Sequence, residues 1–151
     1  MINERQISGK TVLVTGGAGF IGSHLVDRLL VEGAAHVVVI DNMFLGSEEN
    51  LVEAHATGKL SFYKDDAEFV SSLEYVFSRH PVDIVFNCAT KALNYSFLNP
   101  ANAFGTNVTV ALNLLEFQRR GVFSTLCHFS TSEVYGSAVY EPMDEQHPRH
   151  P

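Results

Sequence analysis

Glycines at a fixed spacing form the part of this sequence best suited to hold phosphate. In VTGGAGFIGSH, Gly16, Gly19 and Gly22 form G-x-x-G-x-x-G, and Gly17 with the last two also satisfies G-x-G-x-x-G. In such a turn the early glycines permit a tight bend, the middle one lets backbone amides approach a pyrophosphate, and the last lets helix and strand pack closely. A helix that begins here would direct its positive end at the phosphates. The stretch predicts a dinucleotide site, with a purely structural turn as the alternative.

A carboxylate at the end of the next apolar run supports that prediction. The run HVVVID (36–41) ends in Asp41, which follows Gly22 at about the twenty-residue spacing expected between a dinucleotide-binding glycine turn and an acidic ribose ligand. The carboxylate can accept hydrogen bonds from both adenosine ribose hydroxyls, and it would repel the 2′-phosphate of NADP. We therefore expect NAD as the cofactor. The alternative is an ordinary exposed acid at a strand end.

A second polar stretch, STSEVYG (130–136), follows the apolar run STLCHFS (124–130). If that run is a strand of a parallel sheet, the polar stretch lies at the carboxyl end of the sheet, where open α/β folds bind their ligands. Thr131 and Glu133 are its candidate reactive residues. In the alternative interpretation, Thr131 is a hydroxyl cap on strand-end backbone and Glu133 is a solvated acid.

Strands and helices must bring these candidate residues together, and the periodicity of the apolar residues indicates where those strands and helices lie. Short apolar strands, expected at 11–15, 36–41, 60–64, 82–89 and 124–130, alternate with amphipathic helical stretches. This alternation predicts an α/β fold: a Rossmann-like doubly wound parallel sheet of about five strands, in the order 3-2-1-4-5, with helices on both faces. A long helix is expected to begin at Asn99 and Pro100 and to end near Gly121. Its apolar face includes Phe104, Val108, Leu112 and Leu115.

Composition restricts the possible partners. The 151-residue chain is 46% hydrophobic and carries a formal net charge of −7, so we expect no nucleic-acid or anionic-membrane surface. Its apolar runs are too short to span a bilayer and it shows no signal-peptide core, so we expect a cytoplasmic protein. Cys88 and Cys127 lie in apolar runs without metal-ligand spacing, and we expect buried, reduced thiols. His147 and His150 have no third ligand at a useful spacing, so no metal site is expected.

Taken together, the motifs resemble those of a known family. The segments VTGGAGFIGSHL, VIDN, NVTVALNLLEF and STSEVYG follow one another as they do in the extended short-chain dehydrogenases/reductases, specifically the NAD-dependent epimerase/dehydratase group that acts on nucleotide sugars. The order and roughly the spacing match, and the resemblance covers nearly the whole chain. It implies an NAD cofactor and a UDP- or dTDP-hexose as the class of substrate.

The resemblance implies cofactor contacts at the glycine turn and after the second strand. Phe20 and Ile21 would lie beside the pyrophosphate. Asp41, Asn42 and Gly46 would enclose the adenosine ribose. These residues belong to two loops that the expected sheet brings to the same edge.

Further contacts are implied by three later segments. Asp65 and Asp66 fall where the family contacts the adenine, with Asp66 in place of the usual apolar residue. In NCATK (87–91), Cys88 and Ala89 would face the cofactor, and the two residues that follow receive no role. Asn107 matches a helix asparagine that supports the cofactor loop. Its alternative is a polar residue turned out of the helix.

For the reaction, the resemblance implies roles for Thr131 and Glu133. Thr131 stands where a hydroxyl donates a hydrogen bond to the sugar hydroxyl being oxidised, and a hydroxyl suits an oxygen whose charge changes during hydride transfer. Glu133 aligns with a carboxylate of the dehydratases and decarboxylases, and it could remove the acidic C5 proton of a 4-keto sugar. Epimerisation, dehydration and decarboxylation stay open as fates of that intermediate.

The general base of the family is not within the sequence. It is the tyrosine of a Y-x-x-x-K motif, whereas Tyr135 is followed four positions later by Val139, and Tyr140 by Asp144. A phenol with a pKa of about 10 and no cation beside it is a poor base at neutral pH. We therefore expect residues 1–151 to be an incomplete NAD-binding domain of a longer enzyme, and its uncovered sheet edge to favour a homo-oligomer. The alternative is a non-catalytic NAD-binding module or an assembly partner.

Overall fold

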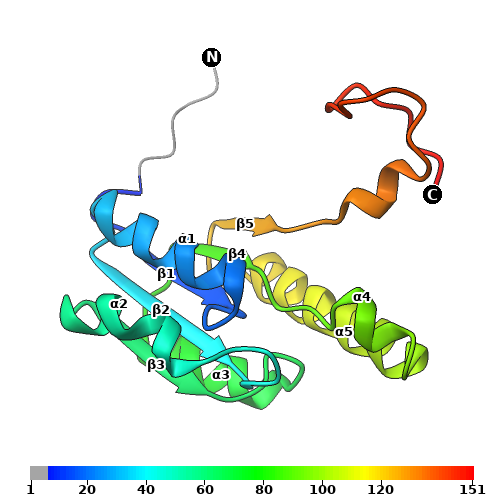
Figure 1. The fold of residues 1–151 in the computed structure, drawn as a ribbon. Coiled ribbons are helices and arrows are strands. Elements are labelled where there is room, and N and C mark those ends of the chain that lie inside the picture. The colour runs from blue at the N-terminus through cyan, green and yellow to red at the C-terminus, as the bar shows by residue number, and fades with distance from the viewer. Residues whose placement is uncertain (1–6) are drawn as a thin grey trace.

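A five-stranded parallel sheet in the order β3-β2-β1-β4-β5 forms the centre of this computed structural model, which describes residues 7–151 (Figure 1). The strands are β1 (Thr11–Thr15), β2 (His36–Asp41), β3 (Leu60–Lys64), β4 (Ile84–Asn87) and β5 (Thr125–His128). The helices are α1 (Phe20–Val31), α2 (Val52–Ala56), α3 (Val70–Arg79), α4 (Leu93–Ser96) and α5 (Pro100–Arg119), with 3-10 helices η1 (Glu48–Leu51) and η2 (Ser132–Tyr135). The predicted Rossmann-like class and strand order are confirmed. Residues 1–6 of the predicted domain lie outside the described residues.

The strands end in register at the edge of the sheet where ligands are expected. Thr15 of β1 pairs with Ile40 of β2 and with Asn87 of β4, and Asn87 pairs with His128 of β5. Strands β4 and β5 end at this row, so both are shorter than the predicted strands at 82–89 and 124–130. The loops that leave the strands therefore start side by side.

Local sequence signals set the limits of the helices. The Asn99 side chain accepts a hydrogen bond from the amide of Asn102 at 3.1 Å and Pro100 takes the first helical position, so α5 begins as predicted. Helix α3 ends at Arg79, because His80 precedes a proline and takes an extended backbone.

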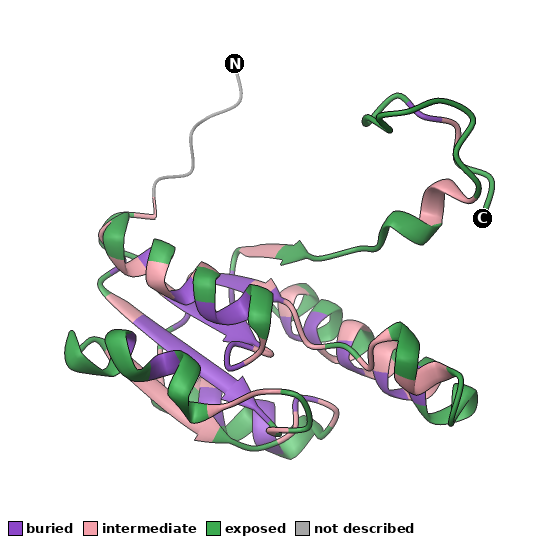
Figure 2. Ribbon diagram, viewed as in Figure 1, coloured by how far each residue is buried: buried purple, intermediate pink, exposed green. Residues whose placement is uncertain are grey.

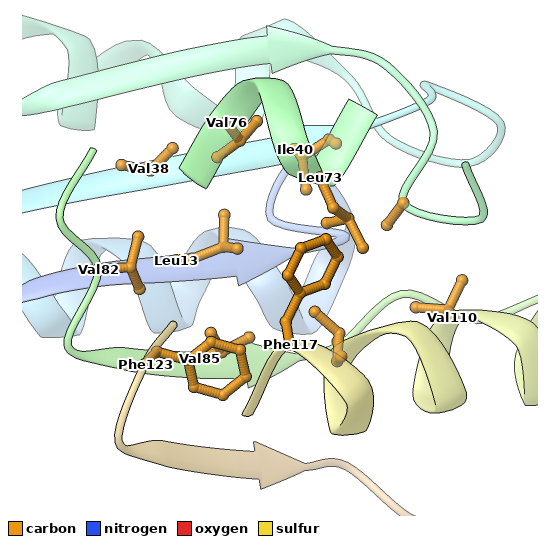
Figure 3. Close-up of a cluster of buried hydrophobic side chains, with 12 residues drawn as sticks. Leu13, Val38, Ile40, Leu73, Val76, Val82, Val85, Val110, Phe117 and Phe123 are labelled. Atoms are coloured by element: carbon orange, nitrogen blue, oxygen red, sulfur yellow. The ribbon is translucent and has the colours of Figure 1, made fainter. Parts of the chain in front are cut away.

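Apolar side chains pack against different helices on the two faces of the sheet. On one face β1, β2 and β4 pack against α3 and α5, and Figure 3 shows this cluster around Leu13, Leu73 and Phe117. On the other face the sheet packs against α1 and the η1–α2 segment through residues such as Val26 and Leu51. Burial on both faces explains why the central strands are apolar at nearly every position.

The side of α5 that packs on the sheet is not its predicted apolar face. The buried residues of the helix are Ala103, Thr106, Val110, Leu114 and Phe117. The predicted face is exposed by 72, 38, 59 and 50% at Phe104, Val108, Leu112 and Leu115. Figure 2 shows both buried and exposed residues along α5. Both rows have helical spacing, so periodicity alone could not identify the one that meets the sheet. Over residues 7–151 no helix, α5 included, combines the length and apolarity needed to cross a membrane.

The prediction that both cysteines are buried is wrong. Cys127 is exposed and Cys88 is only half-buried, and both are free thiols. Cys127 lies on β5, an edge strand of the described sheet, where no helix covers its side chain. Burial raises the pKa of the Cys88 thiol to about 11, and the nearby Cys127 adds to this shift. The Cys88 side chain is therefore a neutral thiol at neutral pH and behaves as a small apolar group.

The segment after β5 leads away from the sheet and closes on itself (Figure 1). Gly136 forms a β-bridge with His150, and the Val139 amide donates to Nε2 of His147 at 2.9 Å. His147 is 2% exposed, and its ring packs edge-on against Tyr135 with centroids 5.7 Å apart. The histidine thus has a structural role in this part of the chain.

His80 connects the end of α3 to β3. Its Nε2 and the Tyr63 hydroxyl are hydrogen-bonded at 2.7 Å, and its ring stacks on His36 with centroids 5.5 Å apart. Burial lowers the pKa of His80 below its ordinary value of 6.5, and the positive charges of His36 and Arg79 lower it further. The folded chain therefore binds a proton at His80 less readily than the unfolded chain does.

We predict that the free energy of unfolding falls as the pH is lowered through and below about 6.5, because the unfolded state then takes up the proton preferentially. His80→Gln should reduce this fall, as measured by denaturant unfolding at several pH values. His55→Gln, at an exposed position, is the matched control and should retain it. The same pH dependence in His80→Gln and the wild type would contradict the role of His80.

Candidate functional site

The glycine turn between β1 and α1 leaves no room for a side chain at Gly16 or Gly22. Gly16 has φ +69°, and a Cβ built on it would lie 2.8 Å from the Cα of Ala89, just beyond β4. A Cβ on Gly22 would overlap the carbonyl oxygen of Gly16. Helix α1 begins at Phe20, and among the described residues no side chain caps this end. Its first backbone amides are therefore available to a ligand, as a phosphate site requires.

Asp41 ties the glycine turn to the loop after β2. Its Oδ2 accepts a hydrogen bond from the Ala18 amide at 2.9 Å, and its Oδ1 accepts one from the Met43 amide at 2.8 Å. The Met43 bond stabilises a backbone with φ +62°, a region that side chains other than glycine rarely adopt. Asp41 is 8% exposed. Each carboxylate oxygen still has a lone pair for a further donor, so the group can also hold a ribose.

A cleft of about 350 Å³ opens at the carboxyl ends of the strands. It is lined by every residue predicted to contact the cofactor except Asn107, namely Gly16, Gly19, Phe20, Ile21, Gly22, Asp41, Asn42, Gly46, Asp65, Asp66, Cys88 and Ala89. Asn42 Nδ2 donates to Asp66 Oδ2 at 2.6 Å, which joins the loops after β2 and β3. The charged residues that line the cleft are Asp41, Asp65, Asp66 and Lys91. Concave sites of this volume bind small molecules in other proteins.

Polar side chains of α5 hold two of the loops that form the cleft. Asn107 Oδ1 accepts from the Lys91 amide at 2.7 Å, and its Nδ2 donates to the Lys91 carbonyl at 3.2 Å. Asn107 thus holds the backbone of the loop after β4. The Thr106 hydroxyl donates to Glu68 Oε2, and Asn113 Nδ2 donates to the Glu68 carbonyl, both at 2.9 Å. Helix α5 therefore also fixes the loop after β3.

A second cavity of about 590 Å³ adjoins the first and contains both candidate reactive residues, Thr131 and Glu133. The two cavities share Ile21, Cys88, Ala89, Thr90, Lys91 and Ala92. A ligand in the cleft would therefore have its far end beside the second cavity. The structure brings the predicted cofactor and reactive residues together in one continuous site.

A buried polar row leads across the sheet to this second cavity. The hydroxyl of Thr15 donates to Asn87 Oδ1, and Asn87 Nδ2 donates to Nδ1 of His128 at 2.9 Å. Thr15 and Asn87 are 0% and 1% exposed, whereas His128 lines the second cavity. The row satisfies polar groups that would otherwise be costly to bury. Since Nδ1 of His128 accepts, its other ring nitrogen carries the proton when the ring is neutral.

Thr131 also has a local structural role. Its Oγ1 accepts a hydrogen bond from the Glu133 amide at 3.2 Å at the start of η2, while its own hydroxyl hydrogen can still donate. Tyr140 Oη donates to Asp144 Oδ1 at 2.7 Å, and this bond raises the pKa of the phenol. Tyr140 is thus even less suited to be a base at neutral pH. Within residues 7–151 no group of three His, Cys, Asp or Glu side chains could hold a metal ion.

Some residues that line the cleft were not predicted. They are Ile40, Phe44, Leu45, Ala67, Thr90, Lys91, Ala92, Thr106 and Val110. Phe44 and Lys91 could have been identified from the sequence, because they stand two positions after the predicted residues Asn42 and Ala89. Thr106 adjoins the predicted Asn107, but it points to a different loop because the two residues lie on different sides of α5.

Comparisons with known proteins agree with this geometry. The sequence model of the GDP-mannose 4,6 dehydratase family matches residues 13–151. UDP-glucose 4-epimerase GEPI42 of Cyamopsis tetragonoloba is 35% identical over 152 residues, which cover 96% of this chain and 43% of that protein. UDP-glucuronic acid decarboxylase 2 of Arabidopsis thaliana is 38% identical over 139 residues, 91% of this chain and 29% of that protein. The crystal structure of UDP-glucose 4-epimerase from Bifidobacterium longum in complex with NAD+ and UDP matches with a TM-score of 0.81 and 32% identity, over 93% of this chain and 42% of that one.

The chain belongs to the GDP-mannose 4,6 dehydratase family. This membership confirms the resemblance of its motifs to the NAD-dependent epimerases and dehydratases of nucleotide sugars. The chain spans less than half the length of each of the three relatives described above.

We predict that Gly22→Ala destabilises the chain by at least about 1 kcal/mol, because its Cβ would overlap the Gly16 carbonyl and push α1 off the turn. Gly105→Ala is the matched control. Gly105 lies within α5 with open space where a Cβ would be, so alanine there should stabilise by about 0.5–1 kcal/mol. Denaturant unfolding measures both. A Gly22→Ala variant as stable as the wild type would contradict the close packing of α1 on the turn.

Proposed function

We propose that this chain binds NAD and that the protein to which it belongs is an NAD-dependent epimerase, dehydratase or decarboxylase of a nucleotide sugar. The observation that carries the proposal is the meeting of three features in one cleft: the glycine turn, the uncapped start of α1 and the Asp41 carboxylate. Family membership supports it, as do the epimerase and decarboxylase relatives.

The binding mode follows from the charges of the cleft. The pyrophosphate would lie on the first amides of α1, where the glycines leave the backbone accessible and the helix dipole favours negative charge. The adenosine ribose would donate its hydroxyls to Asp41, and the adenine would lie near Asp65 and Asp66. Asp41 would repel a 2′-phosphate at short range, so NAD is preferred over NADP.

The second cavity would receive the sugar of a UDP- or dTDP-hexose. Bound NAD would supply the acceptor for the hydride that leaves C4 as the sugar hydroxyl becomes a ketone. Thr131 would donate a hydrogen bond to the reacting oxygen, and Glu133 could remove a proton next to the new carbonyl. The base that takes the hydroxyl proton lies, in this proposal, outside residues 1–151, so this chain alone would not turn over a nucleotide sugar. The fate of the 4-keto intermediate stays open.

We predict that the chain binds NAD more tightly than NADP, as measured by calorimetry. Asp41→Asn should weaken NAD binding by about tenfold or more, the effect expected when hydrogen bonds to a buried charged group are lost. It should weaken NADP binding less, because the repelling charge is also removed. Glu74→Gln, at an exposed position on α3, is the control and should bind as the wild type does. Equal affinity of the wild type for NAD and NADP would contradict the assignment of Asp41.

We also propose that two copies of the chain associate through the exposed apolar face of α5. Phe104, Leu112 and Leu115 are each at least half exposed on one side of this helix, and contiguous apolar surface of that kind is typical of an interface. β5 adds an unpaired edge among the described strands.

We predict that the wild-type chain is larger than a monomer in light scattering. Leu112→Lys should shift it to the monomer, because a charge would be buried in the interface. Val52→Lys, which changes an exposed apolar residue of α2, should not. A wild-type chain that stays strictly monomeric at high concentration would contradict this assembly.

A further inference from the structure

Three side chains meet across the cleft without a hydrogen bond or an ion pair. The ammonium of Lys91 lies 3.6 Å from the ring centroid of Phe44 and 5.3 Å from that of Tyr95. The two rings are themselves in edge-to-face contact, with centroids 5.0 Å apart. A cation over an aromatic face at such distances is attracted by the ring quadrupole. We refer to Phe44, Lys91 and Tyr95 as the clasp.

The clasp joins the loops that follow the two strand neighbours of β1. Phe44 belongs to the loop after β2, whereas Lys91 and Tyr95 belong to the segment after β4, and these two strands are the neighbours of β1 on either side. Phe44 and Lys91 both line the cleft. Among residues 7–151 no hydrogen bond joins the loop at 42–47 to the segment at 88–96. The clasp is therefore a contact between two loops that the backbone does not connect.

Hydrogen bonds hold the chain on both sides of the clasp, which we call its two arms: the segment with Lys91 and Tyr95, and the loop with Phe44. Asn107 holds both backbone polar groups of Lys91, and the Tyr95 hydroxyl donates to Asn102 Oδ1 at 3.0 Å, so α5 fixes one arm. On the other arm, the Phe44 amide donates to Asn42 Oδ1 at 3.0 Å. Because both backbones are held, opening between the arms would occur by separation of the three side chains.

The cleft offers Lys91 other partners that it does not use. Asp41, Asp65 and Asp66 also line the cleft, yet within the described residues the ammonium forms no ion pair with any carboxylate. The rings thus hold the one cation of the cleft lining. The attraction of the rings offsets the rotamer entropy that the half-buried lysine loses when it is held in one position.

We infer that the clasp is a latch that closes the cleft over a bound dinucleotide, so that the cofactor leaves only after Lys91 separates from the rings. This inference rests on the proposed NAD binding. Lys91, Phe44 and Tyr95 are positioning residues in this account: they act on the rate of cofactor exchange through the two loops. Weakening any one of them should speed release.

The existence of the clasp is tested first without cofactor. In an NMR spectrum of the free 151-residue chain, the Cε protons of Lys91 should be shifted upfield by the ring current of Phe44, and Phe44→Leu should remove this shift. Lys59, which is exposed and remote from the cleft, supplies the control resonance and should not change. A Lys91 resonance at the position of an exposed lysine would overturn the inference whatever the cofactor result.

The latch is tested by the release of NADH, followed by its fluorescence after mixing the complex with excess NAD+. Phe44→Leu and Lys91→Met should each raise the release rate by about fivefold, the size of one cation–aromatic contact. The double variant should add little to either single change, because both remove the same contact. Lys59→Met, at an exposed position remote from the cleft, is the control and should release NADH as the wild type does.

Two results would overturn the latch. In one, Phe44→Leu releases NADH at the wild-type rate while Lys91→Met alone weakens binding, so that the lysine acts without the rings. In the other, the effects of Phe44→Leu and Lys91→Met are independent and multiply. If the wild-type chain binds no NADH at all, the proposed cofactor function fails, while the ring-current shift still decides whether the clasp forms.

Discussion

The site depends on the hydrogen bonds that the Asp41 carboxylate accepts from the amides of Ala18 and Met43. These bonds join the glycine turn after β1 to the loop after β2, the two segments that must together hold a dinucleotide. A buried carboxylate is stable here because charged acceptors form the stronger hydrogen bonds with backbone amides. The group that would recognise the ribose is therefore also the group that shapes the cleft.

Helix α5 is the second constraint on the site. Its apolar row packs on the sheet, and three polar residues beside that row, Thr106, Asn107 and Asn113, reach the loops after β3 and β4. A single rigid element thus sets the position of both loops relative to the glycine turn. The other side of the same helix is apolar and exposed, and it is the surface through which we propose that two copies associate.

The sequence predicted the strand order and the residues of the glycine turn because those features depend on local pattern and on glycine sterics. It did not identify which side of α5 meets the sheet, since Val110 and Leu112 belong to two apolar rows with the same period. Cys127 was misjudged because an apolar strand reads the same at the centre of a sheet and at its edge. Lys91 received no role because its partners, Phe44 and Tyr95, come from loops whose approach depends on the whole fold.

We expect a dinucleotide to bind with its pyrophosphate on the first turn of α1 and its ribose on Asp41. An NMR titration of the isotope-labelled chain with NAD tests this most directly. Saturable shifts are expected for the backbone amides of Phe20, Ile21 and Gly22, together with those of Asn42 and Gly46. Amides of the tail at 137–150 should stay unchanged. Shifts confined to the tail or to the outer side of α5, with none at the start of α1, would contradict the account.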